Sequence, residues 1–144
     1  MSRNKARVVA MQALFQLDID IKSVWYVVTE QAEEEDLDEK DLEYLKSISS
    51  AVIENMADID ARISQYSIDW DISRLGKVER AILRLAIGEM LYAEDVPVSV
   101  AINEAVRLAK KFGSEQAAKF INGLLGKLSR EQFPEEEISP DKES

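Results

Sequence analysis

Residues suited to holding a nucleic acid gather in the segment AKFINGLLGK, which begins at Ala118. On a helix that turns roughly 100° per residue, Phe120 projects about 100° from Ile121, the centre of the inward face. Phe120 is therefore predicted to lie at the edge of the core, and two interpretations stay open. A neighbouring helix covers the ring, or the ring stacks on an unpaired base while Lys119 and Lys127 hold phosphates.

Three further groups of basic residues could add to such a surface. Each group by itself is more often a solvated helix face, but three groups together favour an electrostatic footprint for nucleic acid. They comprise Arg3, Lys5 and Arg7 at the N-terminus, Lys77, Arg80 and Arg84 opposite the core stripe of a long helix, and Arg107, Lys110 and Lys111 on the outer face of the next.

The net charge of −10 conceals an uneven distribution of charge. Residues 30–44 hold nine acids and one lysine, and residues 131–144 hold six acids and one lysine. The rest of the chain carries 13 acids and 16 bases, so its surface can be basic. The simpler interpretation of the two acidic segments is a solvated loop and a frayed tail.

The residues of the usual catalytic and metal sites are missing, and nothing singles out a catalytic pair among the 28 acidic residues. The chain has no histidine and no cysteine, which excludes the usual zinc sites, histidine-based triads and thiolate chemistry. It has no glycine-rich loop for nucleotide phosphates, and its aspartate pairs do not continue into calcium loops. We therefore expect no catalytic activity, no metal and no cofactor.

Glu89 is an acidic residue that the helical periodicity turns inward. It shares a helical stripe with Ile82, Leu85 and Ala86. A buried carboxylate needs a partner such as an arginine or the amides of a helix start. We interpret Glu89 as a tie between two helices rather than as a catalytic group.

Apolar residues recur with a period of 3.6 and no segment alternates, which predicts an all-α fold. The expected helices cover residues 5–17, 21–31, 38–56, 59–67, 74–94, 97–112 and a last stretch after Ser114, with Ser73 and Ser114 as N-caps and Gly113 as a stop. We expect a bundle of about seven helices in subdomains of about 1–70 and 71–132. The acidic tail, 133–144, is expected to be disordered.

No segment approaches the roughly 20 apolar residues of a membrane span. The N-terminus also lacks the apolar stretch and cleavage site of a secretory leader. A soluble cytoplasmic protein without a membrane partner is the expectation.

Three stretches resemble the NusB transcription antitermination factors: ARVVAMQALFQLD, DWDISRLGKVERAILRLAIGEM and DVPVSVAINEAVRLAKKFGSEQAAKFINGLLGKL. The third is the most specific, and the resemblance extends over most of residues 3–130. It implies an all-α, non-catalytic protein that binds boxA-type single-stranded RNA together with NusE, a small-subunit ribosomal protein. This complex would join RNA polymerase and suppress termination, notably in ribosomal RNA operons.

The resemblance also implies roles for individual residues. The RNA-facing positions would be Arg3, Lys5, Arg7, Gln116, Lys119, Phe120 and Gly123, and the NusE-facing positions Phe15 and Glu79. The chain differs from many members of the family at three positions. They carry an arginine where this chain has Asn4, a tyrosine where it has Phe15, and an aspartate where it has Gln116.

Two other functions stay open at this stage. One is a helical protein–protein interaction module without an RNA role. The other is a stand-alone relative of the NusB-like domain of ribosomal RNA cytosine methyltransferases, whose catalytic domain carries cysteines that this chain lacks. A homodimer that hides its own binding face is also compatible with the sequence.

Overall fold

The computed structural model describes residues 2–67 and 75–134 and shows seven α-helices and no strand among them. The helices are α1 (Ser2–Phe15), α2 (Ile21–Glu34), α3 (Glu39–Glu54), α4 (Met56–Tyr66), α5 (Lys77–Tyr92), α6 (Val98–Phe112) and α7 (Glu115–Gln132), with a 3₁₀ turn, η1 (Gln16–Asp18), after α1. The predicted all-α fold is confirmed. Within the described ranges, none of the helices has the length and apolar character needed to cross a membrane.

Short polar side chains begin three of the helices. The side chains of Asp20, Asp38 and Ser114 accept hydrogen bonds from backbone amides at the starts of α2, α3 and α7. The predicted cap at Ser114 is confirmed, with 3.0 Å between its Oγ and the amide of Ala117. The predicted cap at Ser73 lies outside the described residues, and α5 begins after Gly76.

The acidic segment 30–44 is mostly helical, which corrects the expectation of a solvated loop. Helix α2 continues to Glu34 and α3 already begins at Glu39, so only a short turn separates them. Amphipathic burial explains the difference, because Ala32 and Leu45 pack into the core while most of the acids face outward and Asp41 is buried beside Arg3. The disordered tail was predicted for 133–144, but Phe133 is partly buried against the core, and the tail beyond residue 134 lies outside the described residues.

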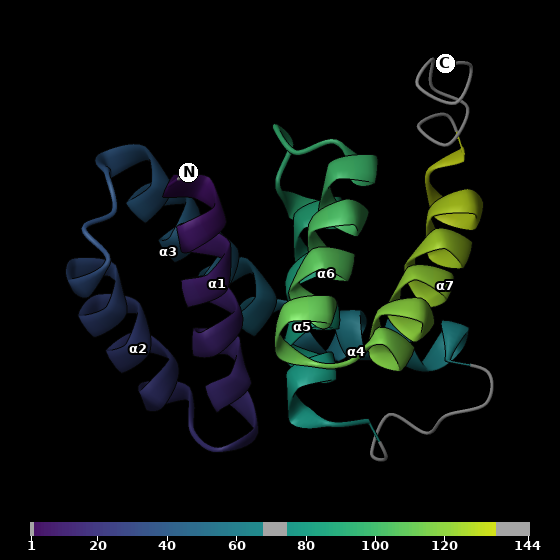
Figure 1. The fold of residues 1–144 in the computed structure, drawn as a ribbon, viewed down its shortest axis with the longest axis horizontal. Helices are drawn as coiled ribbons and strands as arrows, with labels where there is room; N and C mark the ends of the chain where they lie inside the picture. Colours follow the sequence, from purple (N-terminus) through teal and green to yellow (C-terminus); the bar gives the residue numbers. More distant parts are fainter. Residues whose placement is uncertain (1, 68–74, 135–144) are drawn as a thin grey trace.

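The helices pack around one contiguous apolar core. Figure 1 shows α1, α2 and α3 in one half of the molecule and α5, α6 and α7 in the other. Helix α1 packs against α2, α3 and α5 and thereby joins the halves. Helix α4 precedes residue 70 in sequence but packs against α5 and α7, so it lies with the second half. The division into two subdomains stays a prediction.

Candidate nucleic-acid interface

Three of the predicted RNA-facing residues line one hollow of about 630 Å³ at the start of α7. Gln116 and Lys119 are exposed there, and Phe120 is half-buried against the edge of the core. The other wall comes from the beginning of α5 and includes Gly76 and Glu79. The structure therefore brings a lysine, an aromatic ring and an amide together, and places a predicted partner-facing residue, Glu79, beside them.

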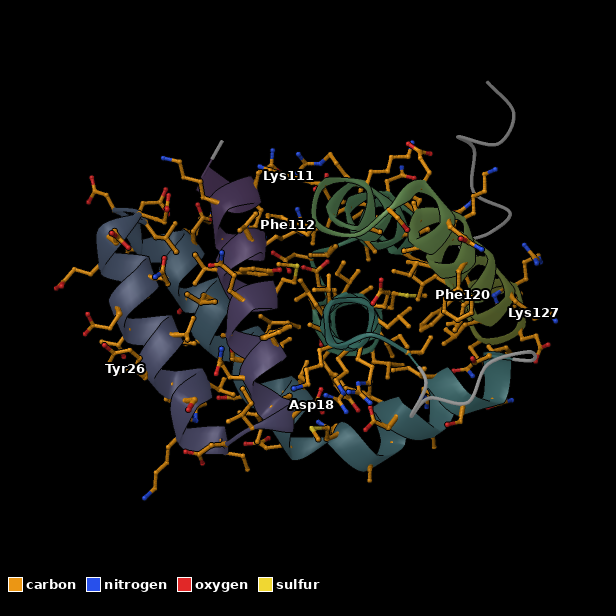
Figure 2. The ribbon with its side chains drawn as sticks, turned by 60° about the horizontal axis from the view of Figure 1, so that its bottom comes forward. Asp18, Tyr26, Lys111, Phe112, Phe120 and Lys127 are labelled. Carbon is orange, nitrogen blue, oxygen red and sulfur yellow. The ribbon has the colours of Figure 1, made fainter. Side chains whose placement is uncertain are left out.

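Local packing explains why these side chains face the hollow. Ile121, Leu124 and Leu125 are buried and fix the rotation of α7 against α5 and α6. Phe120 then falls at the core edge, as its helical projection predicts. Lys127 lies seven residues further along the same side of α7, and Figure 2 shows both residues on that helix.

Gly123 lies beside a different hollow. It is exposed and contributes to a depression of about 350 Å³ between α6 and α7, which Asn103 and Arg130 also line. A Cβ built on Gly123 would meet no atom within 4 Å. The packing of this protein therefore does not require a glycine at that position.

The three N-terminal basic residues have very different surroundings. Arg3 is half-buried, pairs with Asp41 at 2.7 Å and stacks over the ring of Tyr44 at 4.3 Å from its centroid. Lys5 is exposed. Arg7 is only 5% exposed. Figure 1 shows the N-terminus at the opposite end of the bundle from the start of α7, so these residues do not line the hollow beside Phe120.

Arg7 belongs to a buried polar cluster. Its Nε donates to Oε2 of Glu89 at 3.0 Å, and the hydroxyl of Tyr44 donates to the same oxygen. Burial by itself lowers the pKa of Arg7, but Glu89, Tyr44 and Glu104 together outweigh it and the pKa is raised. Burial and then Glu89 raise the pKa of Tyr44 well above its ordinary value. The prediction that Glu89 ties two helices together is confirmed.

The predicted basic face of Lys77, Arg80 and Arg84 is wrong in part. Arg84 is 4% exposed and donates to both carboxylate oxygens of Asp60, at 2.9 and 3.0 Å. Arg80 and Arg84 also pair with Asp18, at 3.1 and 3.4 Å. Burial by itself lowers the pKa of Arg84. The carboxylates of Asp60 and, to a smaller extent, Asp18 outweigh this effect, so the pKa of Arg84 is raised. Helix α4 and turn η1 cover this side of α5, and Lys77 alone of the three is exposed.

The two predicted partner-facing residues, Phe15 and Glu79, lie at the same end of the bundle. Both are half-buried, and Phe15 packs at the edge of the core. The ion pair between Asp18 and Arg80 holds the end of α1 against the first turn of α5, directly beside Glu79. The Glu79 carboxylate reaches toward Gly113, between α6 and α7.

Sequence reasoning missed a second lysine–aromatic pair, at the end of α6. Phe112 is 36% exposed, and the Lys111 ammonium lies 5.5 Å from the centroid of its ring. Figure 2 shows both residues on the side of α6 that faces α1. The sequence signal was present, because Lys111, Phe112 and Gly113 repeat the residue types found around Phe120.

The acidic side chains of residues 2–67 and 75–134 do not form a metal site. No set of three or more acidic side chains there lies close enough together to hold a metal ion.

The arrangement of these helices is that of a known all-α class. NusB of T. maritima superposes with a TM-score of 0.81 at 34% identity, over 94% of this chain and 96% of that one. A structure of the antitermination factors NusB and NusE in complex with dsRNA contains a chain that superposes with a TM-score of 0.79 at 30% identity, over 90% and 97%.

Sequence comparison gives the same result. The NusB family profile matches residues 4–130. The transcription antitermination protein NusB of Acetivibrio thermocellus is 44% identical over 89% of this chain and 88% of its own length. That of Bacillus subtilis is 41% identical over 89% and 95%. The chain belongs to the NusB family, as the sequence motifs predicted.

Proposed function

We propose that this protein is a non-catalytic transcription antitermination factor that binds boxA-type single-stranded RNA together with NusE. The observation that carries the proposal is the hollow in which Gln116, Lys119 and Phe120 meet. The names of its relatives, which are transcription antitermination proteins, support the regulatory role. The proposed setting is the RNA polymerase complex on ribosomal RNA operons.

The chemistry of the hollow fits an unpaired nucleotide. One base stacked on an aromatic ring contributes about 1–3 kcal/mol, whichever base it is. The exposed Lys119 ammonium would hold the adjoining phosphate, and the Gln116 amide can both donate to and accept from a base edge. Phe112 and Lys111 provide a second surface of the same kind at the neighbouring helix end.

The N-terminal residues would contribute differently from one another. Lys5 is exposed and can contact a phosphate of the RNA. Arg3 presents a partly exposed guanidinium beside Tyr44. Arg7 is buried against Glu89, so we assign it a role in the interior that fixes α1. Few cations of this protein thus reach the RNA, which makes an additional basic partner necessary for tight binding.

The partner would bind where the end of α1 meets the start of α5. Phe15 offers apolar surface there and Glu79 a carboxylate. Because Glu79 also borders the hollow, a basic NusE residue paired with it would lie close to the bound RNA. A similar protein has been solved with NusE and dsRNA together, which supports NusE and RNA as joint partners.

Titration of labelled boxA RNA with this protein, with NusE and with both proteins tests the proposal. We expect weak binding to this protein alone and much tighter binding in the presence of NusE. A double-stranded boxA competitor should bind less well, since its bases are not available for stacking. Equal RNA affinity with and without NusE would contradict the proposal that the two proteins bind RNA together. If no mixture binds RNA, a protein–protein interaction module would be the function.

A further inference from the structure

Helix α2 carries an apolar outer face that the proposed RNA and NusE surfaces do not use. Ile21 is 53% exposed, Trp25 36% and Tyr26 67%, and Ile19 in the preceding turn is 61% exposed. Figure 2 shows Tyr26 on the outer side of α2, at the edge of the molecule away from α7. Contiguous exposed apolar residues of this size indicate an interaction surface.

This face continues into a hollow of about 310 Å³ between α2 and α3. Thr29 lines the hollow one turn after Trp25, so the two features adjoin. Its apolar walls include Leu37 and Leu42, which are only partly buried. Its rim carries the exposed carboxylates of Glu33 and Asp36 and, on α3, the exposed ammonium of Lys46. An apolar floor with two acids on the α2 side of the rim fits a large apolar side chain whose flanking cations face that side, away from Lys46.

The backbone at Asp36 is unusual. Its φ of 55° makes it the one non-glycine residue with a positive φ in the described part of the chain. The amide of Asp36 donates to the carbonyl of Glu33, and that of Leu37 donates to the carbonyl of Ala32. This pattern ends a helix with a left-handed residue, a position at which glycine is preferred. An aspartate there carries backbone strain and places a carboxylate on the rim, a combination typical of functional positions.

We propose that the outer face of α2 and the adjoining hollow form a docking surface for a basic segment of a second partner protein. A large apolar side chain of that segment would enter the hollow, and its lysines or arginines would face Glu33 and Asp36. Charge complementarity supports a basic partner, because the surrounding residues 30–44 hold nine acids and one lysine. The surface is separate from the hollow beside Phe120, so this partner and RNA can bind simultaneously.

A synthetic amphipathic peptide of leucine and lysine serves as the probe, and its leucine–glutamate counterpart as the negative control. Isothermal titration should show saturable binding of the lysine peptide to the full chain and none of the glutamate peptide. Trp25→Ala combined with Asp36→Asn should weaken binding about tenfold or more, the usual loss for an anchoring aromatic residue and a paired charge. Asparagine tolerates the left-handed backbone, so this variant retains the turn.

A matched control comes from a second hollow that also contains an exposed tyrosine and acid, Tyr92 and Glu94. Tyr92→Ala combined with Glu94→Gln should leave the affinity for the lysine peptide within about twofold, since rim charges far from a binding surface contribute little. Asp36→Gly should raise the urea midpoint of unfolding while it weakens peptide binding. Equal weakening by the control variant would mean non-specific charge attraction and would overturn the proposal. Self-association that Trp25→Ala abolishes would assign the face to a second copy of the chain and would also overturn it.

Discussion

Arg7 and Glu89 form an ion pair that joins α1 to α5 across 82 positions of sequence. The Nε of Arg7 lies 3.0 Å from Oε2 of Glu89, and the two side chains are 6% and 1% exposed. Tyr44 of α3 donates to the same carboxylate, so three helices meet at one buried charge. The position of the N-terminal helix therefore depends on a polar cluster inside the protein, and Arg7 serves this cluster rather than the surface.

Replacing Arg7 with methionine would leave the Glu89 carboxylate buried without its cation. Breaking a buried ion pair from one side typically costs about 3–5 kcal/mol of unfolding free energy. We expect a loss of this size for Arg7→Met in urea unfolding followed by circular dichroism. At a temperature where the variant is folded, the salt dependence of its RNA binding should be unchanged. A decrease of about 0.7 in the slope of log affinity against log salt would instead identify Arg7 as a phosphate contact.

Tyr44 makes stability depend on pH in the alkaline range. Its pKa is raised well above the ordinary value by burial and by Glu89. Its contribution to stability is therefore fully present below the unfolded pKa of about 10 and is lost as the pH rises through the higher folded value. The ultraviolet absorbance of tyrosinate should show one of the four tyrosines ionising last, or only on unfolding. In Tyr44→Phe this late step should be missing, and its persistence would assign the shift to another tyrosine.

The sequence predicted the helices well because each carries its own apolar stripe. The stop at Gly113, the cap at Ser114 and the inward turn of Glu89 are all set by neighbours along one helix. The edge position of Phe120 follows from the same periodicity. Local patterns of this kind can be read directly from the residues.

The burial of Arg84 could not be predicted from helical periodicity. Its projection away from the core stripe is correct, but Asp60 of α4 and Asp18 of η1 cover that side and bury it. These partners lie 24 and 66 positions away in sequence, so helical periodicity contains no information about them. The pairing of Arg7 with Glu89 could not be predicted for the same reason, although the sequence indicates that Glu89 needs an arginine or the amides of a helix start as its partner.

Glu79→Lys tests the partner surface. Glu79 is half-buried at the start of α5, beside the end of α1, and takes no part in the apolar core. Reversing its charge should weaken NusE binding at least tenfold in calorimetry, because a basic partner residue would then face a lysine. The circular dichroism spectrum should stay the same. As a matched control, Glu54→Lys alters an exposed acid on α3 and should leave NusE affinity as it is. An unchanged dissociation constant in Glu79→Lys would remove this residue from the interface.

Gly123→Ala tests whether a glycine at this position is needed for protein packing or for close contact with the RNA backbone. A Cβ meets nothing in the protein, and alanine favours the middle of a helix over glycine by about 0.5–1 kcal/mol. Thermal unfolding should therefore show a small gain in stability. If the RNA backbone comes close to this position, RNA affinity should fall although the protein is more stable. Unaltered affinity would restrict the RNA path to the hollow beside Phe120.

Phe120→Ala and Lys119→Ala should affect RNA binding in different ways. Loss of the ring should cost about 1–3 kcal/mol of RNA affinity, the value of one base–aromatic stack, with little change in salt dependence. Loss of the exposed ammonium should reduce the salt slope by roughly 0.7. Folding stability distinguishes a stacking ring from a core ring. Replacing a fully buried phenylalanine with alanine costs about 3–5 kcal/mol of unfolding free energy. Because Phe120 is only half-buried, Phe120→Ala should cost clearly less. A large loss of unfolding free energy with normal RNA affinity would show that the ring only seals the core, and Phe112 would then be the next residue to test for stacking.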